Sequence, residues 1–172
     1  MSGTYATATE AAIRQATDIV GALVDESAAA DGSGMDRLLR GSAPIVPEIQ
    51  LYLAADAVLL WARLEALFAR PVSVPFWASA WAGGQGIARY VLDNPQTVTG
   101  RRVLDLASGC GLAAIAVAIA GGDVVANDID PLAVAAIELN AQLNGVKLTS
   151  RLSLNPPMRS LRDHFKVRYR YW

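Results

Sequence analysis

The chain has 172 residues, of which 53% are hydrophobic, and its formal net charge is −1. This length suggests one domain with enough apolar residues for a packed core. The near-neutral charge gives no electrostatic reason to expect nucleic-acid binding. The single cysteine, Cys110, excludes an internal disulfide and fits a reducing cytoplasm, where we expect the protein. No apolar stretch reaches the ~20 residues of a membrane span, and the N-terminus lacks the order of a signal peptide.

The N-terminal part of the chain predicts two helical stretches with a linker between them. Apolar residues recur at helical spacing over residues 11–24, and residues 28–34 are small and polar. We therefore expect residues 1–40 to be a helical or flexible extension. A second helix is predicted from Pro47 to about Phe68, in which Trp61 is more easily read as a core residue than as a ligand.

An alternation of helix and strand patterns follows and predicts the fold class. The predicted segments are a helix over 84–92, a strand over 102–106, a helix over 111–120, a strand over 123–128, a helix over 131–144 and a strand from Gly145. This order implies a parallel sheet with helices packed on it. We therefore expect an α/β domain over residues 41–150.

A glycine-rich loop joins the first predicted strand of this domain to its helix. Gly109 and Gly111 allow a tight turn and a close approach of a ligand to the main chain, and the helix that follows directs free N–H groups at that ligand. Asp128 ends the next strand, 19 residues after Gly109. At that place an acidic side chain can accept hydrogen bonds from both hydroxyls of a ribose. The pattern predicts a cofactor that contains a nucleoside.

Two cofactors fit this loop, and Asp105 favours one of them. Read as Gly109-x-Gly111-x-x-Ala114, the loop also satisfies the dinucleotide fingerprint. Asp105 lies four residues before Gly109, where its charge would repel a pyrophosphate but suit the α-ammonium and sulfonium of S-adenosylmethionine (SAM). We therefore favour SAM over a nicotinamide cofactor. A glycine turn without any ligand remains a further alternative.

Two more features near this loop each allow a structural and a functional interpretation. Trp77 and Trp81 are four residues apart and would share one face if this segment is helical. Composition favours a buried core pair, and the alternative is that they form the wall of a pocket just before Gly83. Asp130 precedes Pro131, a pattern typical of a helix N-cap, so capping is favoured over a contact with adenosine.

Four motifs in this order resemble a known family. They are Pro75-Phe-Trp…Trp81-Ala-Gly-Gly-Gln85, Leu92-Asp-Asn-Pro95, Val103-Leu-Asp-Leu-Ala-Ser-Gly-Cys-Gly111 and Ala126-Asn-Asp-Ile-Asp-Pro131. Together they resemble the electron transfer flavoprotein beta-subunit lysine methyltransferases and their bacterial relatives, over about residues 40–146. The resemblance implies a Rossmann-like class I methyltransferase sheet and SAM as the cofactor. It also implies methyl transfer to a lysine of a partner protein, such as the beta subunit of electron transfer flavoprotein.

The resemblance also implies which residues bind the cofactor. These are Trp81, Gly83, Asp105, Ala107, Ser108, Gly109, Gly111, Asp128 and Ile129. Ala107 stands where many relatives have glycine, and because alanine is small we expect little effect. Neither a catalytic residue nor a metal ligand is assigned.

The C-terminal residues depart from the pattern of the family. Residues 1–146 contain 15 acidic and 8 basic residues, whereas residues 147–172 contain 1 and 7. Strand periodicity fails beyond Thr149, so we expect an incomplete sheet and an irregular basic tail over 151–172, either solvated or foreign to the family, as after a frameshift. Three hypotheses follow: a protein-lysine methyltransferase, a truncated and catalytically inactive SAM-binding fragment, or an NAD-dependent oxidoreductase.

Overall fold

A computed structural model describes residues 2–24 and 34–152 of the chain, with the side chains described from Thr9 onwards. The helices are α1 (Ser2–Leu23), α2 (Ala57–Phe68), α3 (Ala82–Asp93), α4 (Leu112–Ile119) and α5 (Pro131–Leu143), with short 3-10 helices η1 (Phe76–Ala78) and η2 (Pro95–Thr97). The strands are β1 (Leu38–Ala43), β2 (Val46–Ala54), β3 (Arg102–Leu106), β4 (Asp123–Asp128) and β5 (Thr149–Leu152). No helix in these described ranges is long and apolar enough to cross a membrane.

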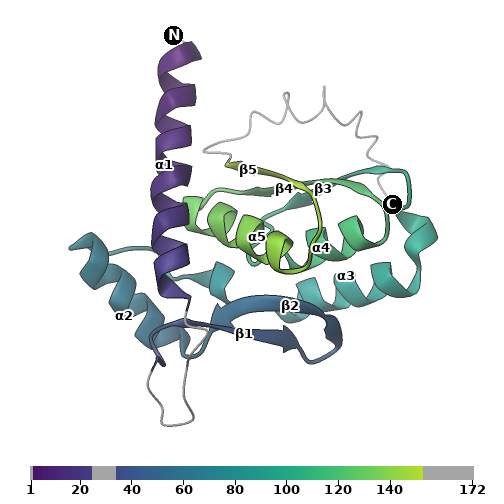
Figure 1. The fold of residues 1–172 in the computed structure, drawn as a ribbon, viewed down its shortest axis with the longest axis horizontal. Helices are drawn as coiled ribbons and strands as arrows, with labels where there is room; N and C mark the ends of the chain where they lie inside the picture. Colours follow the sequence, from purple (N-terminus) through teal and green to yellow (C-terminus); the bar gives the residue numbers. More distant parts are fainter. Residues whose placement is uncertain (1, 25–33, 153–172) are drawn as a thin grey trace, which may run out of the picture.

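The strands β3, β4 and β5 form a parallel sheet with β4 in the middle. The connections through α4 and α5 confirm the predicted alternation of strand and helix (Figure 1). Leu106 at the end of β3 pairs with Asn127 of β4, so the carboxyl ends of these two strands lie side by side. The glycine loop that follows β3 and Asp128 at the end of β4 therefore meet at one edge of the sheet.

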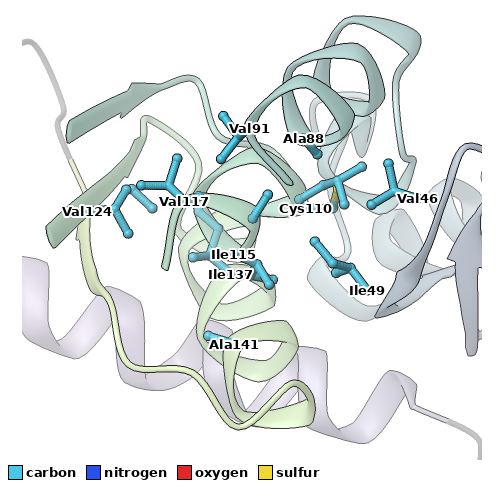
Figure 2. Close-up of a cluster of buried hydrophobic side chains, with 14 of the residues drawn as sticks. Val46, Ile49, Ala88, Val91, Cys110, Ile115, Val117, Val124, Ile137 and Ala141 are labelled. Atoms are coloured by element: carbon cyan, nitrogen blue, oxygen red, sulfur yellow. The ribbon is translucent and has the colours of Figure 1, made fainter. Parts of the chain in front are cut away.

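The helices α4 and α5 lie between this sheet and the antiparallel β1–β2 hairpin (Figure 1). Because both helices are covered on two sides, they are apolar around most of their surface. The outer helices complete the arrangement, since α3 packs on α4 and α1 packs along α5. Figure 2 shows the resulting core, to which the hairpin, α3, the glycine loop, α4, β4 and α5 contribute Val46, Ile49, Ala88, Val91, Cys110, Ile115, Val117, Val124, Ile137 and Ala141.

The predicted helix from Pro47 to Phe68 is wrong in its first half. Residues Val46–Ala54 form β2, in which Ile49 and Leu51 are buried while Glu48 and Gln50, which alternate with them, are less so. This alternation has the period of a strand, and it competes with the helical pattern over the same residues. The helix begins only at Ala57, where the Asp56 side chain accepts hydrogen bonds from two backbone amides of the first turn.

The other predicted elements are found close to their expected places, with two differences. The last strand begins at Thr149 rather than at Gly145, because Gly145 has a φ of +64° and forms the turn after α5. Arg151 and Leu152 pair with β4, so the expectation of an irregular tail from residue 151 is wrong for these two residues, and residues 153–172 lie outside the described ones. The strand β3 is partly exposed, since it pairs only with β4 among the described residues and Leu106 is 57% exposed.

Candidate cofactor-binding site

A cavity of about 670 Å³ opens at the carboxyl ends of β3 and β4. This volume lies within the range of ~300–1,000 Å³ that is usual for sites of small molecules. One wall consists of the residues that directly follow the two strands, Ala107, Gly109, Asp128 and Ile129. The other walls come from α1, from the segment after α2, from the aromatic residues around η1 and from the start of α5, and include Ala12, Gln15, Ile19, Phe68, Arg70, Val72, Phe76, Trp77, Trp81, Asp130 and Leu132.

The turn after β3 contains three residues in the left-handed backbone region. Gly109 and Gly111 have φ values of +54° and +81°, which glycine adopts without strain. Ala107 has a φ of +56°, a conformation that costs about 1–2 kcal/mol for a residue with a Cβ atom. Alanine at this position therefore strains the backbone even though its side chain is small, which its size alone does not indicate.

Asp128 ties the glycine loop to the end of β4. Its Oδ2 accepts a hydrogen bond from the Gly109 amide at 3.0 Å, and its Oδ1 accepts from the amides of Ile129 and Asp130 at 2.8 and 3.1 Å. A carboxylate has about four acceptor positions, so about one remains for a ligand in the cavity. The hydrogen bond to a ribose that the sequence predicts could use this remaining acceptor position, whereas backbone amides of the protein occupy the others.

Ser108 and Gly111 contact the strands and α5 and are not among the residues that line the cavity. The Ser108 hydroxyl donates to the carbonyl of Asp105 at 3.1 Å and accepts from the Asn127 amide at 3.2 Å. A Cβ on Gly111 would lie 3.3 Å from the Cα of Ile137, so the absence of a side chain lets the loop pack tightly on α5. Both residues determine the shape of the loop.

Asp105 is a largely buried carboxylate whose Oδ2 lacks a hydrogen-bond partner in the described part of the chain. Burial raises the pKa of Asp105, a hydrogen bond from the Ala114 amide opposes the shift, and the nearby Asp128 adds to it. A carboxylate in this setting would be stabilised by a positive charge. Asp105 lies behind the residues that line the cavity, directly under the loop.

The loop has few amides left for an anionic ligand. The Gly109 amide donates to Asp128, and the Gly111 amide donates to the carbonyl of Ser108 at 2.8 Å. A pyrophosphate bound at a glycine loop needs such amides as donors. The geometry therefore disfavours the dinucleotide alternative.

The two tryptophans lie on different elements, so they do not share one helical face. Trp77 lies in η1 and is 3% exposed, whereas Trp81 precedes α3 and is 58% exposed. The Trp81 indole N–H donates to the Phe76 carbonyl at 2.8 Å, and the ring centroids of Phe76 and Trp81 lie 5.8 Å apart. Trp77 is thus a core residue that also borders the cavity, and Trp81 forms its aromatic rim. Gly83, in the first turn of α3, does not line it.

Asp130 caps α5, as its position before Pro131 predicts. Its side chain accepts a hydrogen bond from the Leu132 amide at 2.9 Å. Burial raises the pKa of Asp130, although hydrogen bonds from the amides of Leu132 and Ala133 oppose the shift. Because Asp130 also lines the cavity, it adds a second carboxylate near Asp128.

The sequence did not indicate that α1 forms a wall of this cavity. Its residues Ala16, Val20 and Leu23 are buried, and the helix packs along α5. Gln15 and Ile19 therefore face the same cavity as Asp128. Helical periodicity predicts which face of α1 is apolar, but not the element that this face contacts.

Comparisons with known proteins point to methyltransferases. The family of ribosomal protein L11 methyltransferases (PrmA) matches residues 90–166. The electron transfer flavoprotein beta subunit lysine methyltransferase of Rattus norvegicus is 48% identical over 106 residues, which cover 61% of this chain and 41% of the relative. Its human counterpart is 49% identical over 104 residues, which cover 60% and 39%. A homologue in Caenorhabditis elegans is 39% identical over 104 residues, which cover 60% and 42%.

Among solved structures, the chain matches that of Pyrococcus abyssi tRNA (uracil-54, C5)-methyltransferase in complex with S-adenosyl-L-homocysteine, with 25% identity and a TM-score of 0.34. This match covers 38% of this chain and 17% of that one. The chain spans about two fifths of the length of the curated relatives that it matches. The resemblance indicated by the motifs is confirmed: over about three fifths of its residues, this chain is similar to the electron transfer flavoprotein beta subunit lysine methyltransferases.

Proposed function

We propose that this chain binds SAM and serves the transfer of its methyl group to a lysine of a partner protein. The observation that carries the proposal is the largely buried carboxylate of Asp105, whose Oδ2 has no hydrogen-bond partner among the described residues, below a loop whose two glycine amides are already bonded. Such a site suits a cationic nucleoside better than a phosphate. The names of the similar proteins supply the acceptor, a lysine, and the first partner to test, the beta subunit of electron transfer flavoprotein.

The cofactor would lie along the edge formed by the ends of β3 and β4. The remaining acceptor capacity of Asp128 would hold a ribose hydroxyl, and Ile129 and Trp81 would provide apolar surface for the adenine ring. Asp105 would balance the positive charge of the ligand. Ala107 and Gly109 would contact it through their main chain, while Ser108, Gly111 and Gly83 would shape the loop and the nearby helix start.

When bound, SAM would supply a methyl group on its sulfonium: a neutral amine attacks the methyl carbon in line, the C–N bond forms as the C–S bond breaks, and S-adenosylhomocysteine leaves as a neutral thioether. The residues of this chain would hold the donor in one orientation, and alignment of this kind can lower a barrier by about 7–11 kcal/mol. The acceptor ammonium must first lose its proton. We assign no residue to that step. We place the reaction in the cytoplasm, in keeping with a single cysteine that forms no disulfide.

Calorimetry with SAM and with NAD, on the full chain, tests the cofactor. We expect SAM to bind and NAD to bind much more weakly or not at all. Asp128→Ala should weaken SAM binding by about 1.5–3 kcal/mol, because a charge-assisted hydrogen bond is lost and the loop loses its anchor. Glu138→Ala, on the side of α5 that contacts Ser150 of β5, is the control and should leave SAM binding unchanged. Tighter binding of NAD than of SAM would refute the proposal.

A further inference from the structure

Asn140 of α5 is a completely buried polar residue in a helix whose other buried residues are apolar. Both ends of its side-chain amide are used. The Oδ1 accepts a hydrogen bond from the Tyr52 amide of β2 at 2.7 Å, and the Nδ2 donates to the Cys110 carbonyl at 2.9 Å. A single side chain therefore joins the hairpin, α5 and the glycine loop.

The contact with Cys110 reaches the centre of the glycine loop. The peptide unit between Cys110 and Gly111 is held at both ends, because its carbonyl accepts from Asn140 and its amide donates to the Ser108 carbonyl at 2.8 Å. Gly111, whose Cα bounds this unit on one side, has a positive φ and no side chain that could restrict rotation there. The orientation of this peptide unit depends on its hydrogen bonds.

Asn144, one helical turn later, provides a natural comparison. Its Oδ1 accepts from the Gln50 amide at 2.9 Å, and its Nδ2 donates to the carbonyls of Gln50 and Asn140 at 2.6 and 2.7 Å. It therefore fastens the same strand, β2, to the same helix. Unlike Asn140, it makes no hydrogen bond to the glycine loop among those of the described residues.

We propose that Asn140 is a positioning residue that fixes the Cys110 carbonyl and thereby the glycine loop of the cofactor site. Without its donor, the Cys110–Gly111 peptide unit can rotate, and the Gly109 amide is no longer held opposite Asp128. Only the consequence for SAM binding rests on the proposed function, since the effect on the loop itself does not require a ligand.

Cys110 itself makes the loop measurable, because it is the only cysteine of the chain. It is 5% exposed, and burial raises the pKa of its thiol, so it should react with a thiol reagent only when the loop opens. Loss of one buried hydrogen bond changes an opening equilibrium by a factor of about ten. In native buffer, Asn140→Ala should therefore label about tenfold faster than the wild type. Asn144→Ala should label at the wild-type rate, even where it lowers the melting temperature as much.

The affinity for SAM should also differ between the variants of Asn140 and Asn144. We expect it to be about tenfold weaker in Asn140→Ala and unchanged in Asn144→Ala. If Asn140→Ala does not fold, Asn140→Asp decides, because it keeps an acceptor for the Tyr52 amide and removes the donor to Cys110. Equal labelling rates for variants of Asn140 and Asn144 would overturn the proposal. Failure of the wild type to bind SAM would refute the proposed function instead. The labelling rates would still test whether Asn140 positions the glycine loop.

Discussion

Asp105 combines two properties that seldom occur together without a ligand, namely burial and an unpartnered carboxylate oxygen. Burial raises its pKa above the usual value of 3.8, so the folded protein binds a proton more readily at this site than the unfolded chain does. The contribution of Asp105 to the stability of the free protein therefore falls as the pH rises from 3.8 through the raised pKa. A cationic ligand would reverse the preference, because it favours the ionised form.

This reasoning predicts opposite effects of Asp105→Asn on stability and on binding. At neutral pH the variant should have a higher free energy of unfolding, because it removes a buried charge, and it should bind SAM more weakly. In the wild type, SAM affinity should increase with pH across the window in which Asp105 ionises. Burial also raises the pKa of Asp130, so Asp130 contributes part of the pH dependence, and this part remains in Asp105→Asn. Denaturation curves and calorimetry at several pH values provide the measurement. A variant that is less stable at neutral pH would contradict the interpretation of Asp105.

At the level of single residues, the sequence indicated the chemistry of the site better than its geometry. The types and spacing of Asp105, Gly109 and Asp128 point to the ligand without any structure. The main-chain hydrogen bonds that occupy Asp128, and the strain at Ala107, depend on how the loop folds back on β4. The role of Asn140 depends on β2, which lies 88 residues earlier in the chain, and no local motif records such a contact.

Among the secondary-structure elements, those with local signals were the predictable ones. The strands β3 and β4 and the helix α5 follow from apolar runs and from the cap at Asp130. The β1–β2 hairpin was missed because its alternation competes with a helical period, and the cap at Asp56 marks where the helix α2 begins. The place of the hairpin in the fold is determined by contacts between β2 and α5, which are far apart in the sequence. A pattern read from neighbouring residues does not contain such contacts.

The packing of the glycine loop on α5 leads to a prediction for Gly111→Ala. The new Cβ would meet the backbone of Ile137 at 3.3 Å, and φ is +81°. Left-handed strain and overpacking together should lower the free energy of unfolding by about 2–4 kcal/mol. Gly100→Ala is the matched control, because Gly100 has a φ of +68° but open space around it, so strain alone should lower the value by about 1–2 kcal/mol. Urea denaturation measures both, and equal losses would show that close packing at Gly111 is unimportant.

In the whole molecule, the candidate cofactor site lies at the end of a layer of packed helices. Both helices that follow the sheet strands, α4 and α5, lie on the same face of the sheet (Figure 1). The cavity lies at the end of this layer, and α1 closes it from the side of α5. The donor methyl group would thus be held by rigid, well-packed elements, as precise alignment requires.

The proposed transfer of the methyl group is tested on the whole molecule. Incubation of the full chain with labelled SAM and the beta subunit of electron transfer flavoprotein should place label on lysine. Because Asp128 would bind the ribose, remote from the reacting carbon, Asp128→Ala should raise the KM for SAM and change kcat much less. A variant with an unchanged KM and a lower kcat would show that Asp128 acts on the reacting centre instead. SAM binding by the wild type without any label on the partner would favour the alternative of a catalytically inactive SAM-binding protein, since donor binding alone does not align an amine.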